Sequence, residues 1–237
     1  MDVIRQVKDA LSSYINQEKA DYLPRFFNAV PGGYGEGDLF MGIAVPDQRA
    51  VAKKYYQKAS LDEITALLKD EYHECRLTAL FMLVNLYERT KDEALKEAVI
   101  DSYLNHLDHV NNWDLVDSSA YKLLGPHLQN RDRAILYELA MSTDLWRQRI
   151  AINTTLHFIR QHDFNDTLSL AEILLHHPHD LIHKAVGWML REVGNRNLEM
   201  EREFLNKHYR EMPRTMLRYA IEKFDPGVRE QYMKGKV

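Results

Sequence analysis

The sequence predicts an all-α fold in which pairs of helices repeat along the chain as an α-solenoid. Apolar residues recur at intervals of three or four residues nearly throughout, which is the spacing of one helix face. No segment alternates convincingly between apolar and polar residues, as a half-buried strand would. No linker rich in Pro, Gly or Ser interrupts the 237 residues, so we expect a single repeat domain over residues 1–237.

Residues 1–59 are expected to form N-terminal helices and a glycine-rich loop. Four glycines fall within residues 32–37 and disfavour a helix there, so residues 31–46 are interpreted as an ordered loop. The first 14 residues mix charged and apolar positions at helical spacing, unlike a signal peptide. No apolar run approaches the ~18 residues of a membrane span. With Cys75 as the only cysteine, we expect a cytoplasmic protein without disulfides or membrane segments.

Helix pairs are expected over about residues 60–225, because helix boundary signals recur there. Ser60 to Glu63 forms a capping box, and Gly125–Pro126 and Gly194–Asn195 predict helix ends. Pro213 predicts the start of a last helix. Residues 226–237 are expected to be a basic C-terminal tail.

A weak repeat supports the pairing of helices. Several second helices place a basic residue just before small and branched apolar residues: Arg76, Arg149, Lys184 and Arg214. Arg149 and Lys184 are 35 positions apart, and two helices per ~35 residues is typical of a HEAT-type solenoid. Stacked pairs align equivalent helices on one wall, so we expect these residues to line a concave basic groove.

The net charge of −4 argues against indiscriminate binding of polyanions. A surface for nucleic acid would therefore need a local concentration of basic residues. Residues 205–237 contain eight Lys or Arg against four acids, a balance of +4 that leaves −8 for the remainder. The C-terminal end is the basic end.

The residues with most chemical information are Trp113, Asp117, Arg149 and Trp188. Trp113 and Asp117 are four positions apart and share one helix face. An indole offers its electron-rich face to a cation, and a carboxylate stabilises nearby positive charge or orients an attacking water. These groups suit the oxocarbenium-like transition state of glycosidic bond cleavage at a deoxyribose. The alternatives are core packing for each Trp and a surface or capping role for Asp117, although Asn111 or Asn112 is the better cap.

Four segments, in order along the chain, carry a resemblance to a known family. They are residues 34–49 (YGEGDLFMGIAVPDQR), 112–117 (NWDLVD), 146–149 (WRQR) and 184–192 (KAVGWMLRE). Together they resemble the AlkD family of DNA alkylation repair glycosylases, and the resemblance extends over about residues 15–225.

The resemblance implies a HEAT-like repeat enzyme that excises 3-alkyladenine and 7-alkylguanine from duplex DNA, leaving the base in the stack until it is cleaved. No pocket motif for a base is evident in the sequence. By this resemblance Asp117 is the catalytic carboxylate, and Trp113 and Trp188 pack on the deoxyribose and backbone. The residues expected to bind DNA are Arg49, Arg149, His157, Lys184 and Arg191. His157 stands where family members often place a Lys, and its imidazole is largely neutral at pH 7.

An alkylated purine already carries positive charge, so it can leave without protonation by a general acid. Stabilisation of the sugar cation is then the main task, for which one carboxylate in a partly dry site suffices. We expect no cofactor and no metal. The expected partner is alkylated double-stranded DNA, and a monomer suits an open groove.

Two other functions compete with this hypothesis. A cluster of histidines resembles a metal site: His176, His177, His179 and His183. Pro178 interrupts the helical spacing and leaves only two of them at i and i+4, whereas a catalytic metal needs a third ligand. The second alternative is a HEAT-type scaffold that binds DNA or protein without chemistry. Release of methylated purine from treated DNA separates the enzyme from the scaffold.

Overall fold

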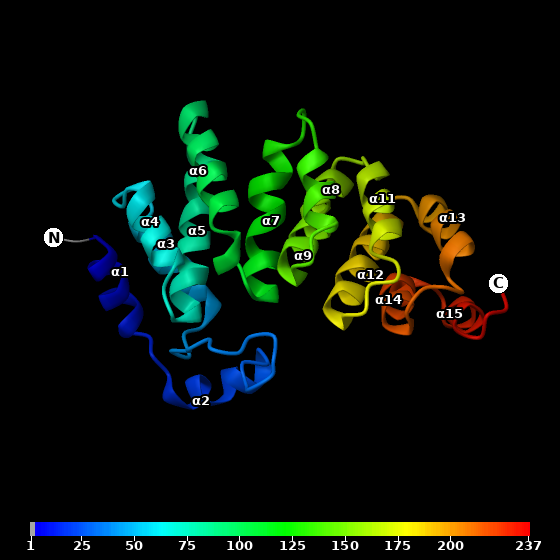
Figure 1. Ribbon diagram of the computed structural model, residues 1–237, viewed down its shortest axis with the longest axis horizontal. Helices are drawn as coiled ribbons and strands as arrows, with labels where there is room; N and C mark the ends of the chain where they lie inside the picture. Colours follow the sequence, from blue (N-terminus) through cyan, green and yellow to red (C-terminus); the bar gives the residue numbers. More distant parts are fainter. Residues whose placement is uncertain (1–2) are drawn as a thin grey trace. The chain divides into compact units, whose positions relative to one another are not determined.

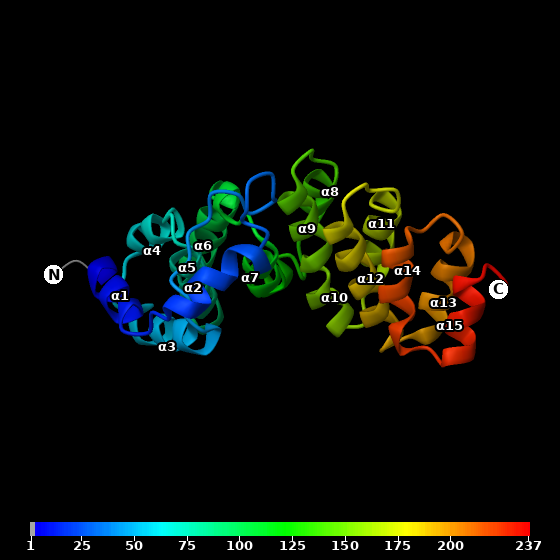
Figure 2. The same cartoon turned by 90° about the horizontal axis from the view of Figure 1, so that it is seen from below.

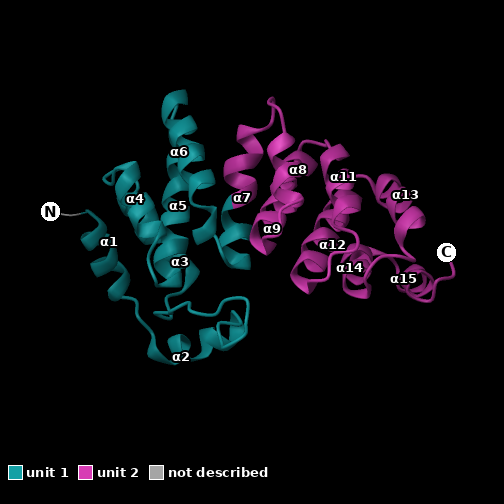
Figure 3. Ribbon diagram, in the orientation of Figure 1, with its two compact units in different colours: residues 1–119 teal, residues 120–237 magenta. Residues whose placement is uncertain are grey.

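The computed structural model describes residues 3–237, and its regular structure is helical (Figure 1). Within the described residues, the only β-type pairing is an isolated bridge between Leu39 and Tyr72. The prediction of an all-α fold is confirmed. The chain forms two compact units, one ending at Ser119 and the other running from Ala120 to Val237 (Figure 3). We call them the first and the second unit; the expectation of a single domain stays a prediction.

The first unit is built around one long buried helix. Its elements are α1 (Val3–Ser12), α2 (Gln17–Phe26), α3 (Val45–Tyr55), α4 (Leu61–Leu68), α5 (His73–Arg89), α6 (Glu93–Asn105), the 3-10 turn η1 (Leu107–His109) and the start of α7 (Trp113–His127). Helix α5 packs against α3, α4 and α6, and every residue from His73 to Val84 is buried. From Leu77 to Val84 the buried residues are apolar except for Thr78, whereas the first turn of the helix buries His73, Glu74 and Arg76.

A carboxylate of α5 binds the backbone of the loop between α2 and α3. Glu74 accepts hydrogen bonds from the backbone N–H groups of Met41, Gly42 and Ile43 at 3.0, 2.8 and 3.2 Å. Gly42 has a φ of +75°, and a Cβ there would lie 2.1 Å from the carbonyl oxygen of Asn16. Both features require glycine. The segment forms no helix before Val45, as the sequence predicts.

Helix α2 crosses the ends of α3, α5 and α7 (Figure 2). Its N-cap is Asn16, whose side chain accepts a hydrogen bond from the N–H of Lys19. None of its residues is buried, and Tyr22 and Phe26 are 60% and 49% exposed. The helix therefore contributes little to the core of the first unit.

In the second unit, α12 is the central helix. The elements are the rest of α7, α8 (Ala134–Ala140), α9 (Leu145–Thr154), α10 (Leu156–Arg160), α11 (Asn165–Ile173), α12 (Asp180–Gly194), α13 (Leu198–His208), α14 (Arg214–Ala220), the 3-10 turn η2 (Ile221–Lys223) and α15 (Pro226–Met233). Helix α12 packs against α9, α13 and α14. At Gly187 a Cβ would lie 2.5 Å from the carbonyl oxygen of Met216, so glycine permits the close approach of α12 to α14.

The predicted helix boundaries are partly correct. The capping box at Ser60 and Glu63 is present, and α12 ends at Gly194. The end predicted at Gly125–Pro126 is wrong, because α7 continues to His127. Gly125 instead makes room for α10, since a Cβ there would lie 2.3 Å from the Cβ of His157.

The C-terminal region is more helical than expected. Pro213 does precede a helix, α14, but this is not the last one. Residues 226–237, expected as a tail, contain α15, which starts at Pro226 and buries Tyr232. Proline at the first helical position favours such a start. No helix among the described residues is long and apolar enough to cross a bilayer.

Candidate active site

The predicted site residues divide between the two units. The first unit contains Arg49, Trp113 and Asp117, and the second contains Arg149, His157, Lys184, Trp188 and Arg191. Each set is described within its own unit.

Trp113 and Asp117 lie in the first two turns of α7, and both are partly buried. Asn112, one of the two caps expected from the sequence, immediately precedes the helix and is fully buried. Its backbone carbonyl accepts from the N–H of Val116 at 3.1 Å, and its side-chain Oδ1 accepts from the N–H of Trp113 at 2.8 Å. The start of α7 is thus fixed at the residue before the indole.

The Trp113 ring packs against two aromatic rings at the end of α2. Its centroid is 5.2 Å from that of Phe27 in a stacked arrangement and 5.7 Å from that of Phe26 edge to face. Phe27 also lies 4.7 Å from the His73 ring. These contacts orient the indole, and part of its surface stays accessible.

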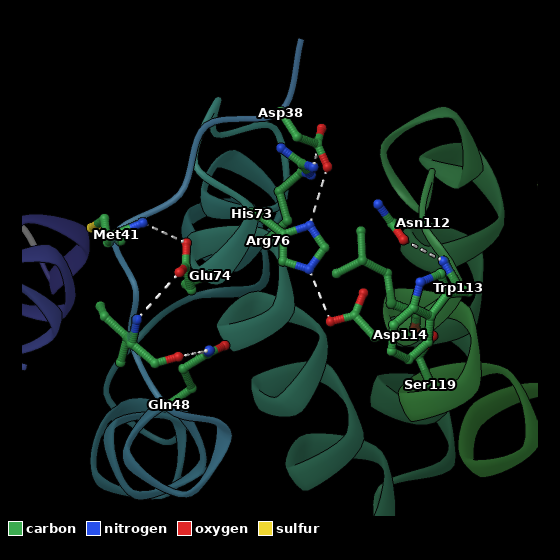
Figure 4. A network of polar contacts seen from close by, with 12 residues as sticks. Asp38, Met41, Gln48, His73, Glu74, Arg76, Asn112, Trp113, Asp114 and Ser119 are labelled. Atoms are coloured by element: carbon green, nitrogen blue, oxygen red, sulfur yellow. Dashed lines mark hydrogen bonds and ion pairs between the residues drawn. The ribbon is translucent and has the colours of Figure 1, made fainter. Parts of the chain in front are cut away.

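A buried ionic network fixes the first turn of α7 (Figure 4). The His73 ring, at the start of α5, lies between two carboxylates: Nδ1 is 3.1 Å from Asp38 Oδ2 and Nε2 is 2.9 Å from Asp114 Oδ2. Burial lowers the pKa of His73, but the charges and hydrogen bonds of Asp114 and Asp38 outweigh it and raise the pKa to about 9. A protonated imidazole then donates from both nitrogens. Asp114 adjoins Trp113, so this contact holds the helix turn that carries the indole.

Arg76 completes the network. Its Nη2 donates to Asp38 Oδ1 at 2.6 Å, and its Nη1 donates to the carbonyls of Asp70 and Glu71. Although burial opposes it, the contacts with His73 and Arg76 hold the pKa of Asp38 below its ordinary value. The prediction that Arg76 lines a basic groove is wrong, because its side chain is 5% exposed and neutralised by Asp38.

Sequence reasoning missed three residues of this network and named only Arg76, in another role. His73, Asp38 and Asp114 are far apart in sequence and have no shared motif. Asp38 and Asp114 do fall within the matching segments 34–49 and 112–117, which was the available signal. Cys75, the only cysteine of the chain, is buried, and burial raises the pKa of its thiol to about 12.

Among the predicted site residues of the first unit, Arg49 is the exposed one. It lies on α3, and its guanidinium carbon is 4.0 Å from the centroid of the Phe81 ring. Stacking on an aromatic face orients a guanidinium while leaving its N–H groups free to meet an anion.

In the second unit, Lys184, Trp188 and Arg191 share one face of α12. All three are partly buried, whereas neighbouring Ala185 and Leu190 are fully buried. Lys184 pairs with Asp180 at 2.8 Å, and Arg191 pairs with Glu222. The two acids are 53% and 48% exposed in their side chains. Exposed ion pairs of this kind are weak and exchange readily.

Arg149 is buried and His157 is partly buried, whereas Arg49, the predicted phosphate contact of the first unit, is exposed. Arg149 is 5% exposed, and its Nη1 donates to the carbonyl of Leu181 at 2.6 Å, which links α9 to the first turn of α12. His157 is partly buried; burial lowers its pKa, assisted by Arg160 and Arg133, so the ring is neutral at pH 7. Their roles on DNA stay predictions.

The histidine cluster makes local hydrogen bonds. His179 is the N-cap of α12, with its Nδ1 accepting from the N–H of Leu181. His177 Nδ1 accepts from the N–H of His179, and His177 Nε2 is 2.8 Å from Gln148 Oε1. Within residues 3–237, no group of His, Cys, Asp or Glu is arranged to hold a metal ion.

The fold defines an all-α protein, and Trp113, Asp117 and Arg49 of its first unit are side chains that can contact a sugar, a developing positive charge and a phosphate. The family model described as DNA alkylation repair enzyme matches residues 7–224, and the chain belongs to this family. Its role is therefore in repair of DNA alkylation, with DNA as substrate.

A predicted DNA alkylation repair enzyme from Enterococcus faecalis has a similar solved structure. The identity is 18%, the TM-score is 0.65, and the match covers 90% of this chain and 97% of the other. At this identity the likeness supports the fold. No curated protein matches the sequence.

Proposed function

We propose that the protein is a DNA glycosylase that hydrolyses the N-glycosidic bond of cationic alkylated purines, 3-alkyladenine and 7-alkylguanine, in duplex DNA. This would be the first step of base excision repair. The observation that carries the proposal is the pair of Asp117 and Trp113 on one face of α7, both partly buried, on a helix whose first turn is held by a buried network.

Asp117 is assigned to the chemistry. The bond from C1′ of the deoxyribose to the purine nitrogen breaks, and its electron pair neutralises the cationic base. The Asp117 carboxylate stabilises the positive charge that develops on the sugar and orients a water molecule. The water oxygen bonds to C1′ and its proton passes to the carboxylate, leaving a neutral base and an abasic site.

The other predicted residues are assigned to binding. Trp113 and Trp188 contact the deoxyribose and backbone at the lesion, and the phosphates are bound by Arg49, Arg149, Lys184, Arg191 and His157. Phosphate contacts position a protein on the duplex and make binding depend on salt. We expect the damaged base to stay in the stack until the bond breaks. The enzyme is proposed to act as a cytoplasmic monomer without a cofactor.

The test is release of free base from DNA treated with a methylating agent, measured by chromatography with protein at stoichiometric concentration. Untreated DNA is the control. We expect 7-methylguanine and 3-methyladenine in the soluble fraction. Binding of the duplex with no base released would contradict the glycosylase proposal and favour the non-catalytic scaffold.

A further inference from the structure

The second unit contains an exposed arginine that is held against an aromatic ring. Arg160 is the last residue of α10, and its guanidinium carbon is 4.9 Å from the centroid of the Tyr121 ring on α7. The Nζ atom of Lys122 is 5.6 Å from the same centroid. Both cations therefore lie within the ~6 Å range of a cation–π contact with one ring.

Neither of these cations has a carboxylate partner among the described residues. The next acid along the chain after Arg160 is Asp163, and it pairs with Arg133 at 2.7 Å. Asp166 also pairs with Arg133, at 2.6 Å. Because Arg133 binds both of these carboxylates, no ion pair neutralises the positive charge beside Tyr121.

The close packing of α10 on α7 determines where these side chains lie. Gly125 is one turn after Tyr121 on α7, and a Cβ there would lie 2.3 Å from the Cβ of His157. His157 is in turn three residues before Arg160 on α10. The two contacts therefore follow one another along the same pair of helices. A guanidinium stacked on a ring is oriented by it and keeps its N–H groups available for phosphate.

The charges around the ring favour an anion as the ligand. Two like charges near one ring repel each other, and an anion bound beside them offsets this repulsion. Lys184 and Arg191 pair with acids in the free protein, whereas Arg160 has no ion pair to break before it binds. Duplex DNA presents one phosphate charge per ~1.7 Å of helix axis, so its backbone is an anion that such a cation can contact.

We propose that Arg160 binds a phosphate of the DNA duplex, with Tyr121 orienting the guanidinium and Lys122 adding to the positive potential. The choice of a duplex phosphate as the anion rests on the proposed function. Arg160 is then a DNA-binding residue in addition to those expected from the sequence.

Equilibrium binding of the full chain to an undamaged fluorescent duplex, measured between about 50 and about 200 mM salt, tests the proposal. Arg160→Gln should weaken binding about tenfold at the lowest salt and reduce the slope of log affinity against log salt by about 1. Arg160→Lys keeps the charge and should keep the slope. An unchanged slope for Arg160→Gln would overturn the proposal, and a lower urea midpoint with that result would assign Arg160 to stability.

Arg202→Gln is the matched control, made at another exposed arginine of the second unit. The guanidinium carbon of Arg202 is 5.7 Å from the centroid of the Phe224 ring. Exposed Glu199 and Glu203 lie on either side of it along α13, so we expect no phosphate there and an unchanged slope. An equal fall in slope for Arg202→Gln and Arg160→Gln would overturn the proposal, because net charge would then explain both.

Tyr121→Leu tests the orienting role of the ring, since it removes the ring and keeps both cations. Affinity for the duplex should fall several-fold, because the guanidinium is no longer oriented, and the salt slope should be kept, because the charge remains. Unchanged affinity would overturn the role given to Tyr121.

The outcome is separable from the proposed function, because the duplex is undamaged and binding is measured without release of a base. Release of methylated base from treated DNA, together with an unchanged slope for Arg160→Gln, would overturn the phosphate site alone. A reduced slope without release of base would contradict the glycosylase alone.

Discussion

The two predicted tryptophans have different surroundings: Trp113 is the first residue of α7, and Trp188 lies in the middle of α12. Before Trp113, in the first unit, Asn112 is fully buried, and the next residue, Asp114, interacts with the buried His73. Around Trp188, in the second unit, the cations on the same face pair with acids that are about half exposed. The first arrangement is held by a buried network, and the second consists of ion pairs with exposed acids.

This difference corresponds to two tasks. A carboxylate that stabilises a transition state must be held in place before the substrate arrives, and a buried network does this. Cations that bind phosphate must first separate from the acids they pair with in the free protein, and weak, exposed ion pairs allow this. We infer that α7 is organised for chemistry and the α12 face for binding.

Asp38→Ala should disrupt the buried network of the first unit and cause the largest loss of stability among these variants. It would leave the buried charge of Arg76 without its carboxylate and His73 with one acid in place of two. Loss of one partner of a buried ion pair costs about 3–5 kcal/mol. Urea unfolding measures the change. A loss under about 1 kcal/mol would mean that the network is not buried as described.

The pH dependence of the free energy of unfolding should reveal the contribution of the protonated His73. Its folded pKa of about 9 exceeds the ordinary value of 6.5, so its contribution is fully present below pH 6.5 and is lost as pH rises through 9. The stability lost when His73 loses its proton is on the order of 3 kcal/mol. Burial raises the pKa of Glu201 to about 8, which also reduces stability as pH rises from 4.5 to 8.

The measurement is therefore made in a Glu201→Gln background, with unfolding free energies at pH 6 and pH 9, because the raised pKa of the Cys75 thiol lowers stability only above about pH 9. His73→Gln in the same background is the control, and it should remove most of the difference. A pH dependence that is the same with and without His73 would show that another group titrates in this window.

Glu222→Gln should have the smallest effect on stability, under about 1 kcal/mol, because its pair with Arg191 is at the surface. The variant should instead raise affinity for duplex DNA several-fold. In the unaltered protein Arg191 must break its ion pair with Glu222 before it binds a phosphate, and in the variant this pair is absent. Arg191→Gln should reduce the slope of log affinity against log salt by about 1. Fluorescence anisotropy at several salt concentrations measures both, and an unchanged slope would remove Arg191 from the interface.

The sequence predicts much of the helical architecture because its signals are local. The capping box at Ser60 needs only four residues, and helical spacing is visible in any window of two turns. The end wrongly placed at Gly125 shows the limit of such signals. Glycine is needed at position 125 because His157, far away in the sequence, packs against it. A local rule cannot distinguish a glycine needed for helix packing from one that ends a helix.

The candidate site was predictable only in part for the same reason. The i and i+4 spacing of Trp113 and Asp117 follows from the sequence. The partners of Arg76 and His73 do not, because Asp38 and Asp114 are 35 to 41 positions away and lie near them through the path of an irregular loop and the start of α7.

The most direct test of this division between chemistry and binding is Asp117→Asn, which keeps the side-chain shape and removes the charge. Single-turnover release of 7-methylguanine and affinity for the same duplex are measured together, with Asp101→Asn, exposed on α6, as the matched control. We predict a rate about 100- to 1000-fold lower for Asp117→Asn with affinity retained. An unchanged rate would contradict the role assigned to Asp117.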